Sequence, residues 1–229
     1  MDSITHYMYL MRQRPELFVQ STHIPLCLEE KTLRAFAACS GKPVGVVYDN
    51  SPYYMVLADL CVGASGRLYT YARVVYPHSD SNGVVVIPRM GERFGLLSIF
   101  RHPPRAESGG EFPRGFAENL TPAENAIKEL WEEIGARVPP ESLVYLGDIQ
   151  SDTGLSAGRV QVFLARVEMA TVPTDNGEGI HGLHWLTEDE LRARISDGTL
   201  TDGLTLAAYS RYLCAFGADN RAVERRREK

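Results

Sequence analysis

The sequence contains few cysteines and no long apolar segment. Its 229 residues include four cysteines, and none of them forms a Cys-x-x-Cys pair with another. This spacing fits the reduced thiols of a cytoplasmic protein better than a disulfide framework. A membrane-spanning helix requires a run of about 18 apolar residues, which is absent. No basic-then-apolar leader follows Met1. We therefore expect a soluble, cytoplasmic protein with no membrane partner.

Positive charge is also scarce. The chain has 24 Lys and Arg residues against 29 Asp and Glu residues, a formal net charge of -5. This balance argues against nucleic acid as a partner, because non-specific binding depends on basic side chains that neutralise phosphates. The arginines at 225–227 are interpreted as part of a solvated tail. An acidic protein that handles an anionic small molecule needs a cation between the two.

The chain length, at roughly 150 residues per domain, predicts one large domain or a domain with an appendage. A short helix broken at Pro15 is expected near the start, and residues 33–37 form either a second short element or a strand. Alternating apolar residues between turn-forming residues predict the strands. They lie at 44–48, 54–61, 67–76, 84–87, 94–100, 143–148, 160–167 and 182–186. Helices are expected at 122–134, 188–196 and 203–216.

The helix at 122–134 has the clearest boundaries. Thr121 is expected to cap its start with Glu124 three residues later, as in a capping box, and Pro122 fits the first helical position. Gly135 is expected to end the helix.

Three glutamates on this helix follow the spacing i, i+3 and i+4, namely Glu129, Glu132 and Glu133. This spacing places their carboxylates on one helical face, where like charges repel unless a cation lies between them. Mg²⁺ is commonly held by a few carboxylates together with substrate phosphates. A run of charge is also typical of a solvated helix face, so the glutamates alone leave both interpretations open.

The residues before and along this helix resemble the sequence motif of the Nudix hydrolases. They read Glu-Phe-Pro-Arg-Gly at 111–115 and Ala-Ile-Lys-Glu-Leu-Trp-Glu-Glu-Ile-Gly at 126–135. The family pattern is a glycine, then a glutamate, then Arg-Glu-x-x-Glu-Glu-x-Gly on the helix. Four further segments are similar to the ADP-ribose pyrophosphatase branch of that family, at 96–101, 152–156, 185–191 and 198–205. The resemblance covers roughly residues 43–216.

The resemblance implies hydrolysis of a nucleoside diphosphate linked to another moiety, ADP-ribose or a nucleotide sugar, with Mg²⁺ or Mn²⁺ as the cofactor. Glu129 and Glu133 match the metal-ligand glutamates, and Glu132 matches a ligand or water-organising residue. The backbone carbonyl of Arg114 stands where the family often adds a ligand. Arg101 is a candidate clamp on the pyrophosphate, because a guanidinium fork suits phosphate oxygens.

The chain departs from the family pattern at three places. The box arginine is Lys128, which keeps the charge and loses the bidentate fork. The loop before it is one residue shorter, so the first box glutamate falls on Leu120, with Glu118 nearby. The third departure is Gly158, which stands where this branch commonly has a glutamate as the general base.

The general base is therefore expected elsewhere. Glu178, in the loop before the last strand, is the candidate, and Asp152 is the alternative. A loop carboxylate is otherwise ordinary surface chemistry.

The expected fold is a Nudix α/β/α sandwich with a mixed central sheet and an N-terminal strand-rich appendage. The expected parts are an extension at 1–42, a hydrolase domain at 43–217 whose strands at 43–80 precede a core at 81–217, and a charged tail at 218–229. A homodimer is expected from the resemblance. Two alternatives stay open: a non-catalytic nucleotide-binding or regulatory module of the same fold, and an enzyme acting on another diphosphate in a biosynthetic pathway.

Overall fold

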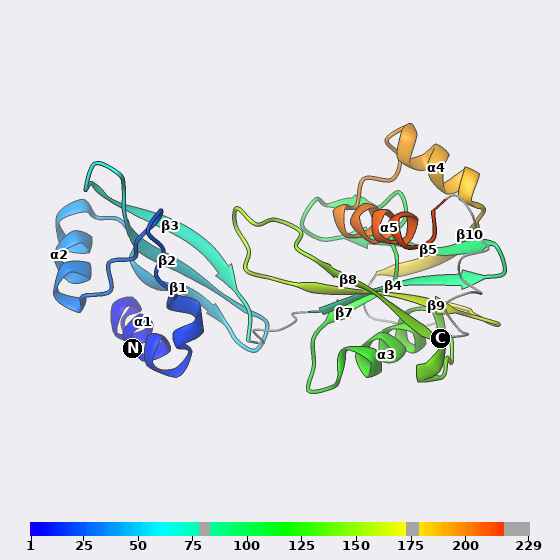
Figure 1. Cartoon of the computed structure of the whole chain (residues 1–229), viewed down its shortest axis with the longest axis horizontal. Coiled ribbons are helices and arrows are strands. Elements are labelled where there is room, and N and C mark those ends of the chain that lie inside the picture. Colours follow the sequence, from blue (N-terminus) through cyan, green and yellow to red (C-terminus); the bar gives the residue numbers. More distant parts are fainter. Residues whose placement is uncertain (78–82, 173–178, 218–229) are drawn as a thin grey trace. The chain divides into compact units, whose positions relative to one another are not determined.

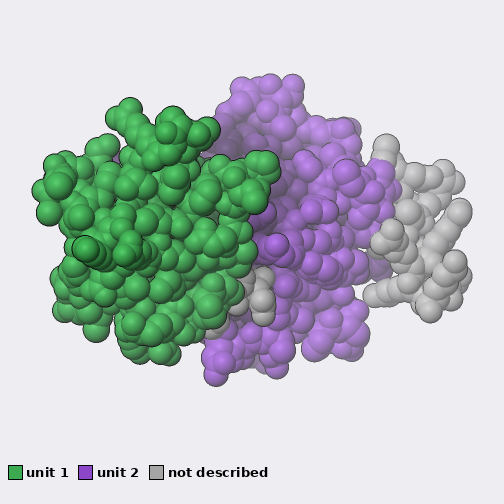
Figure 2. Space-filling model, turned by 60° about the vertical axis from the view of Figure 1, so that its left-hand side comes forward, with its two compact units in different colours: residues 1–79, 152–158 green, residues 80–151, 159–229 purple. Residues whose placement is uncertain are grey.

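The computed structural model describes residues 1–77, 83–172 and 179–217. The chain divides into two compact units (Figures 1 and 2). Unit 1 consists of residues 1–79 together with 152–158, and unit 2 consists of 80–151 and 159–229. The extension expected at 1–42 and the strands expected at 43–80 thus lie in one unit. That unit also contains a segment expected within the hydrolase domain.

Unit 1 is a three-stranded antiparallel sheet with helices, in the strand order β1-β2-β3. Its elements are α1 (Ser3–Gln13), the 3-10 turn η1 (Pro15–Phe18), α2 (Glu30–Ser40), β1 (Gly45–Asn50), β2 (Tyr54–Val62) and β3 (Leu68–Val75). The first helix ends before Pro15 as expected, because proline lacks the amide that would continue the helical hydrogen bonds. Residues 33–37, whose conformation the sequence left open, lie in α2.

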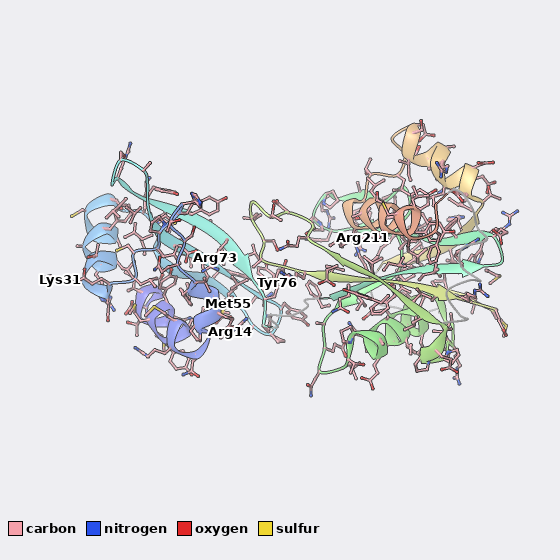
Figure 3. The ribbon with its side chains drawn as sticks, in the orientation of Figure 1. Arg14, Lys31, Met55, Arg73, Tyr76 and Arg211 are labelled. Carbon is pink, nitrogen blue, oxygen red and sulfur yellow. The ribbon has the colours of Figure 1, made fainter. Side chains whose placement is uncertain are left out.

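A buried polar cluster ties the start of unit 1 to its sheet. Asp59 on β2, only 3% exposed, accepts hydrogen bonds from the Tyr7 hydroxyl and from Arg73 on β3. Arg73 is labelled in Figure 3. Arg73 also donates to the carbonyl of Leu17 at 2.7 Å. Burial, and next the negative charge of Asp59, raise the pKa of Tyr7 well above its usual value. The phenol therefore stays protonated and serves as the donor.

Asp59→Asn is expected to destabilise unit 1 by about 3 kcal/mol, because it leaves the Arg73 cation without its buried counter-ion. Urea and thermal denaturation measure this loss. The matched control is Asp49→Asn on β1, an exposed carboxylate whose Ser51 contacts an amide oxygen can also accept. The control is expected to stay within about 0.5 kcal/mol of the wild type. Equal denaturation midpoints for the two variants would contradict a stabilising role for the buried charge.

Unit 2 is built on a mixed sheet. The strand order is β10-β5-β4-β9-β8, with β6 paired to β5 and β7 paired to β4. Only β4 and β9 run parallel along this path. The strands are β4 (Gly83–Met90), β5 (Arg93–Arg101), β6 (Ala106–Glu107), β7 (Arg114–Phe116), β8 (Leu143–Ile149), β9 (Val160–Arg166) and β10 (Ile180–Leu186). The helical elements are α3 (Pro122–Ile134), the 3-10 turn η2 (Pro140–Ser142), α4 (Glu188–Ser196) and α5 (Gly203–Phe216).

Helices cover both faces of this sheet (Figure 1). Side chains of β4 alternate between two apolar clusters, as the period of a strand requires. Val84 and Val86 join the cluster that contains Leu130 of α3. Val85 and Ile87 join the cluster that contains Tyr212 of α5. The expected α/β/α sandwich with a mixed central sheet and an N-terminal three-stranded sheet is confirmed.

Two observations bear on the composition. The four cysteines carry free thiols, and Cys61 alone among them is buried. Within the described residues, no helix is long and apolar enough to cross a membrane.

Candidate active site

Helix α3 has the ends that its sequence predicts. The Thr121 hydroxyl accepts a hydrogen bond from the amide of Glu124, and the Glu124 carboxylate accepts one from the amide of Thr121. Pro122 occupies the first helical position, and Gly135 ends the helix with a positive φ of 60°. These caps satisfy backbone groups that the helix itself leaves unpaired, and so fix which residues the helix presents to the sheet.

Two of the three glutamates of α3 are buried on its inner face. Glu129 is 5% exposed and Glu133 is 2% exposed. The Glu132 side chain is 49% exposed and accepts a hydrogen bond from Lys128 at 2.5 Å. The three glutamates therefore differ in burial: Glu129 and Glu133 face the sheet, whereas Glu132 is half-exposed, and the Lys128 ammonium lies near both Glu132 and Glu129. Glu132 and Glu133 are neighbours in sequence and therefore point about 100° apart around the helix, and of these two the sheet covers Glu133.

The loop that leads into β7 closes over these two carboxylates. The amide of Arg114 donates to Oε2 of Glu133 at 2.9 Å. Gly115 lies directly against the carboxylate of Glu129, and a Cβ at this position would overlap that carboxylate. The backbone segment from which a carbonyl ligand was expected therefore lies at the buried glutamates. Any side chain here would have to displace the Glu129 carboxylate.

Lys128 neutralises the acidic surroundings of the site. Its ammonium lies 3.0 Å from Glu118, 2.5 Å from Glu132 and 4.0 Å from Glu129. Burial opposes its charge, but hydrogen bonds to Glu132 and Glu118 and the charge of Glu129 raise the pKa of Lys128. Glu118 thus forms an ion pair with Lys128. Leu120, which stands where the family motif has a glutamate, is 43% exposed.

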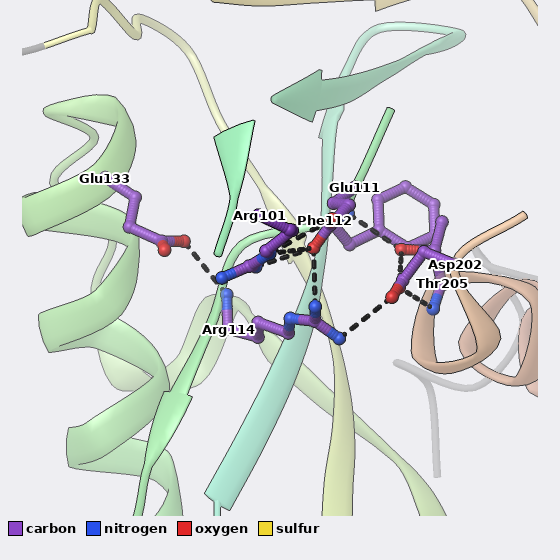
Figure 4. A network of polar contacts seen from close by, with 7 residues as sticks. All are labelled: Arg101, Glu111, Phe112, Arg114, Glu133, Asp202 and Thr205. Carbon is purple, nitrogen blue, oxygen red and sulfur yellow. Dashed lines mark hydrogen bonds and ion pairs between the residues drawn. The ribbon is translucent and has the colours of Figure 1, made fainter. Parts of the chain in front are cut away.

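Two arginines meet one buried carboxylate beside the helix (Figure 4). Glu111, 2% exposed, lies 2.6 Å from the nearest nitrogens of Arg101 and Arg114. Arg114 also contacts Asp202 at 3.1 Å. Arg101 therefore lies beside Arg114, with part of its guanidinium bound to Glu111. The sequence analysis named neither Glu111 nor Asp202 as a site residue, and the available signal was the place of Glu111 at the start of the 111–115 segment that carries the resemblance.

Of the two candidates for the general base, Glu178 lies outside the described residues. Asp152 is exposed, belongs to unit 1 and accepts a hydrogen bond from the amide of Gly154 at 2.9 Å. The amide of Gly158 donates to the hydroxyl of Ser156 at 3.0 Å, so this position takes part in a turn.

The donor set suits a hard divalent cation that shares its ligands with a substrate. In the described part of the chain, no group of three or more His, Cys, Asp or Glu side chains is arranged to hold a metal ion. Mg²⁺ is usually bound through one or two carboxylates together with substrate phosphates. Glu129 and Glu133 provide such a pair, and the phosphate oxygens would supply further ligands.

Buried polar residues concentrate at this place. Seven polar or charged residues are buried within the described ranges, and five of them contact α3 or the 111–115 loop or belong to them. These five are Glu111, Asn125, Glu129, Glu133 and Thr205. Burying charge is costly, so a cluster of buried polar and charged residues is a candidate functional site of the α/β/α sandwich.

The comparisons with known proteins agree with this class. The family model of the NUDIX domain matches residues 78–204, more than half of the chain, and the chain therefore belongs to the Nudix family. Members of this family are generally pyrophosphohydrolases and typically use a divalent metal. A search of curated proteins found no relative.

A solved structure supports the fold. The crystal structure of an ADP compounds hydrolase superposes with a TM-score of 0.60 at 15% sequence identity. The match covers 74% of this chain and 89% of that one. At this identity the likeness concerns the fold alone.

Proposed function

We propose that this protein hydrolyses the pyrophosphate bond of a nucleoside diphosphate linked to another moiety, with ADP-ribose or a nucleotide sugar as substrate and Mg²⁺ or Mn²⁺ as cofactor. Water adds to one phosphorus, the bridging P–O bond breaks, and two phosphorylated products leave. The observation that carries the proposal is the buried pair Glu129 and Glu133 under the 111–115 loop, with two arginines beside it. The name of the structurally similar ADP compounds hydrolase supports this substrate class.

Each group at the site has a proposed task. A divalent cation held by Glu129 and Glu133 would neutralise phosphate charge and lower the pKa of a bound water. Arg101 and Arg114 bind the pyrophosphate oxygens, because guanidinium groups match phosphate geometry. The Arg114 backbone holds Glu133 in place through its amide. Glu132, next to Lys128, is proposed to organise water, and Glu178 is proposed as the general base.

Product analysis tests the proposal. ADP-ribose and a panel of nucleotide sugars are incubated with the protein and Mg²⁺ or Mn²⁺. ADP-ribose is expected to give AMP and ribose 5-phosphate. Hydrolysis in ¹⁸O-labelled water identifies the attacked phosphorus, because only one product then carries the label. Turnover that is independent of divalent cation would contradict the role of the glutamate pair.

A non-catalytic binding module is the second candidate. It is favoured by Gly158, which stands where a catalytic glutamate is common in the similar branch. Calorimetry separates the two: nucleotide binding without metal and without product formation would support the module. A homodimer remains part of the proposal, and sedimentation analysis measures it.

A further inference from the structure

Glu111 is held rigidly by its own backbone. Its amide donates to the carbonyl of Leu97 at 3.1 Å, and its carbonyl accepts from the amide of Leu97 at 2.8 Å. These two bonds attach Glu111 to β5 at Leu97, which precedes Arg101 by four residues on the same strand. The backbone of Glu111 is therefore held in place, and the carboxylate can in turn hold the side chains that bind it.

The carboxylate of Glu111 binds two arginine side chains. Arg101 donates to it from Nε at 3.0 and 3.1 Å and from Nη2 at 2.6 Å. Arg114 approaches the same oxygen, Oε2, through Nη2 at 2.6 Å. Two neighbouring guanidinium groups repel each other. The negative charge of Glu111 between them offsets this repulsion, so that both can lie at the same place (Figure 4).

The second arginine is fixed from the other side by the start of α5. Asp202 contacts Nη1 of Arg114 at 3.1 Å and caps the helix by accepting from the amide of Thr205 at 2.8 Å. The hydroxyl of Thr205 in turn accepts from the amide of Phe112 at 3.1 Å. The helix start and the residue after Glu111 are thereby joined, so Arg114 is held by two carboxylates on one framework.

Donors remain available on both arginines. The contacts with the described residues use Nε and Nη2 of Arg101, and Nη1 and Nη2 of Arg114. Each guanidinium has five N–H donors, so Nη1 of Arg101 and Nε of Arg114 are left for a ligand. The charge of Glu133 also acts on Arg101: burial lowers its pKa, but Glu111 and then Glu133 raise the pKa above its usual value. The arginines therefore lie within electrostatic reach of the metal-binding carboxylates.

We infer that Glu111 is a positioning residue, which orients Arg101 and Arg114 for the substrate's pyrophosphate. The inference rests on the proposed function. A phosphate ligand binds the remaining donors while Glu111 keeps its own bonds.

Glu111→Gln tests this role, because it keeps the shape and removes the charge. KM for ADP-ribose is expected to rise roughly 10- to 100-fold, the usual effect of losing a supporting partner, while kcat falls less. Glu111→Asp, which keeps the charge, is expected to recover part of the loss. In the Glu111→Gln background, Arg101→Lys is expected to add little.

Asp59→Asn is the matched control, since it removes the charge of another buried carboxylate–arginine pair, in unit 1. It lowers stability without raising KM. A folded Glu111→Gln protein with unchanged KM overturns the inference, as does an equal change in KM for the control.

A failure of the proposed function is recognised separately. If the wild type hydrolyses no substrate, calorimetric titration with inorganic pyrophosphate and Mg²⁺ still tests Glu111. Weaker binding by Glu111→Gln than by the wild type and Asp59→Asn then supports the positioning role. Absence of pyrophosphate binding by the wild type, or equal binding by all three proteins, overturns it.

Discussion

Glu129→Gln is expected to lower kcat about 1000-fold while leaving the protein as stable as the wild type or more so. A metal ion contributes several kcal/mol of charge stabilisation, and a loss of about 4 kcal/mol corresponds to this factor. Stability should not fall, because the substitution removes one of two like charges that lie buried together at i and i+4. Glu133→Gln is expected to behave similarly. Steady-state kinetics with Mg²⁺ and ADP-ribose, together with thermal denaturation, measure both effects.

Glu124→Gln is the matched control on the same helix. It also changes one glutamate, but glutamine serves equally in a capping box, so kcat and stability should stay near wild type. Glu132→Gln is expected to have a smaller effect than Glu129→Gln, because Glu132 is half-exposed and paired with Lys128. Full activity of Glu129→Gln would refute the glutamate pair as the metal site. An equal loss for Glu132→Gln would show that α3 presents its carboxylates differently during turnover.

Gly115→Ala is expected to lower kcat about 100-fold through a single added methyl group. The new Cβ would overlap the carboxylate of Glu129, so that side chain has to leave its place. Misplacing a catalytic group by about 1 Å commonly costs this factor. Some stability should also be lost, because overpacking a buried site typically costs about 1–3 kcal/mol.

Two comparisons make the Gly115→Ala result specific. Gly203→Ala also adds a methyl group to a glycine of unit 2, but into open space, and should leave kcat and stability near wild type. In the Glu129→Gln background, Gly115→Ala should reduce kcat little further, since both changes act through the same carboxylate. A fully additive loss in the double variant would place the effect of Gly115 elsewhere.

The parts of the fold set by local sequence could be predicted. Thr121, Glu124 and Gly135 define the ends of α3 through contacts a few residues apart. Strand-forming residues likewise predicted the strands β4, β5, β8, β9 and β10, whereas their arrangement in a mixed sheet was expected from the resemblance. Residues 33–37 were ambiguous, because a short apolar run fits either a helix or a strand.

The parts of the site set by distant contacts could not be predicted. Asp202 reaches Arg114 across 88 positions, and the burial of Glu111 depends on two arginines from different strands. The spacing of the three α3 glutamates does not reveal which of them the sheet covers. That choice is made by tertiary packing, which buries Glu129 and Glu133 and leaves Glu132 beside Lys128.

The path of the chain between the two units has a practical consequence. The segment 152–158 leaves unit 2 and completes unit 1, where Val74 of β3 donates to Leu155 at 2.8 Å and accepts from Ala157 at 3.0 Å. The polypeptide thus passes between the units three times. A truncation after residue 79 would deprive β3 of its neighbouring segment and release the connection between β8 and β9. The two units are therefore not separable by a single cut, and point substitutions are the cleaner way to study either one.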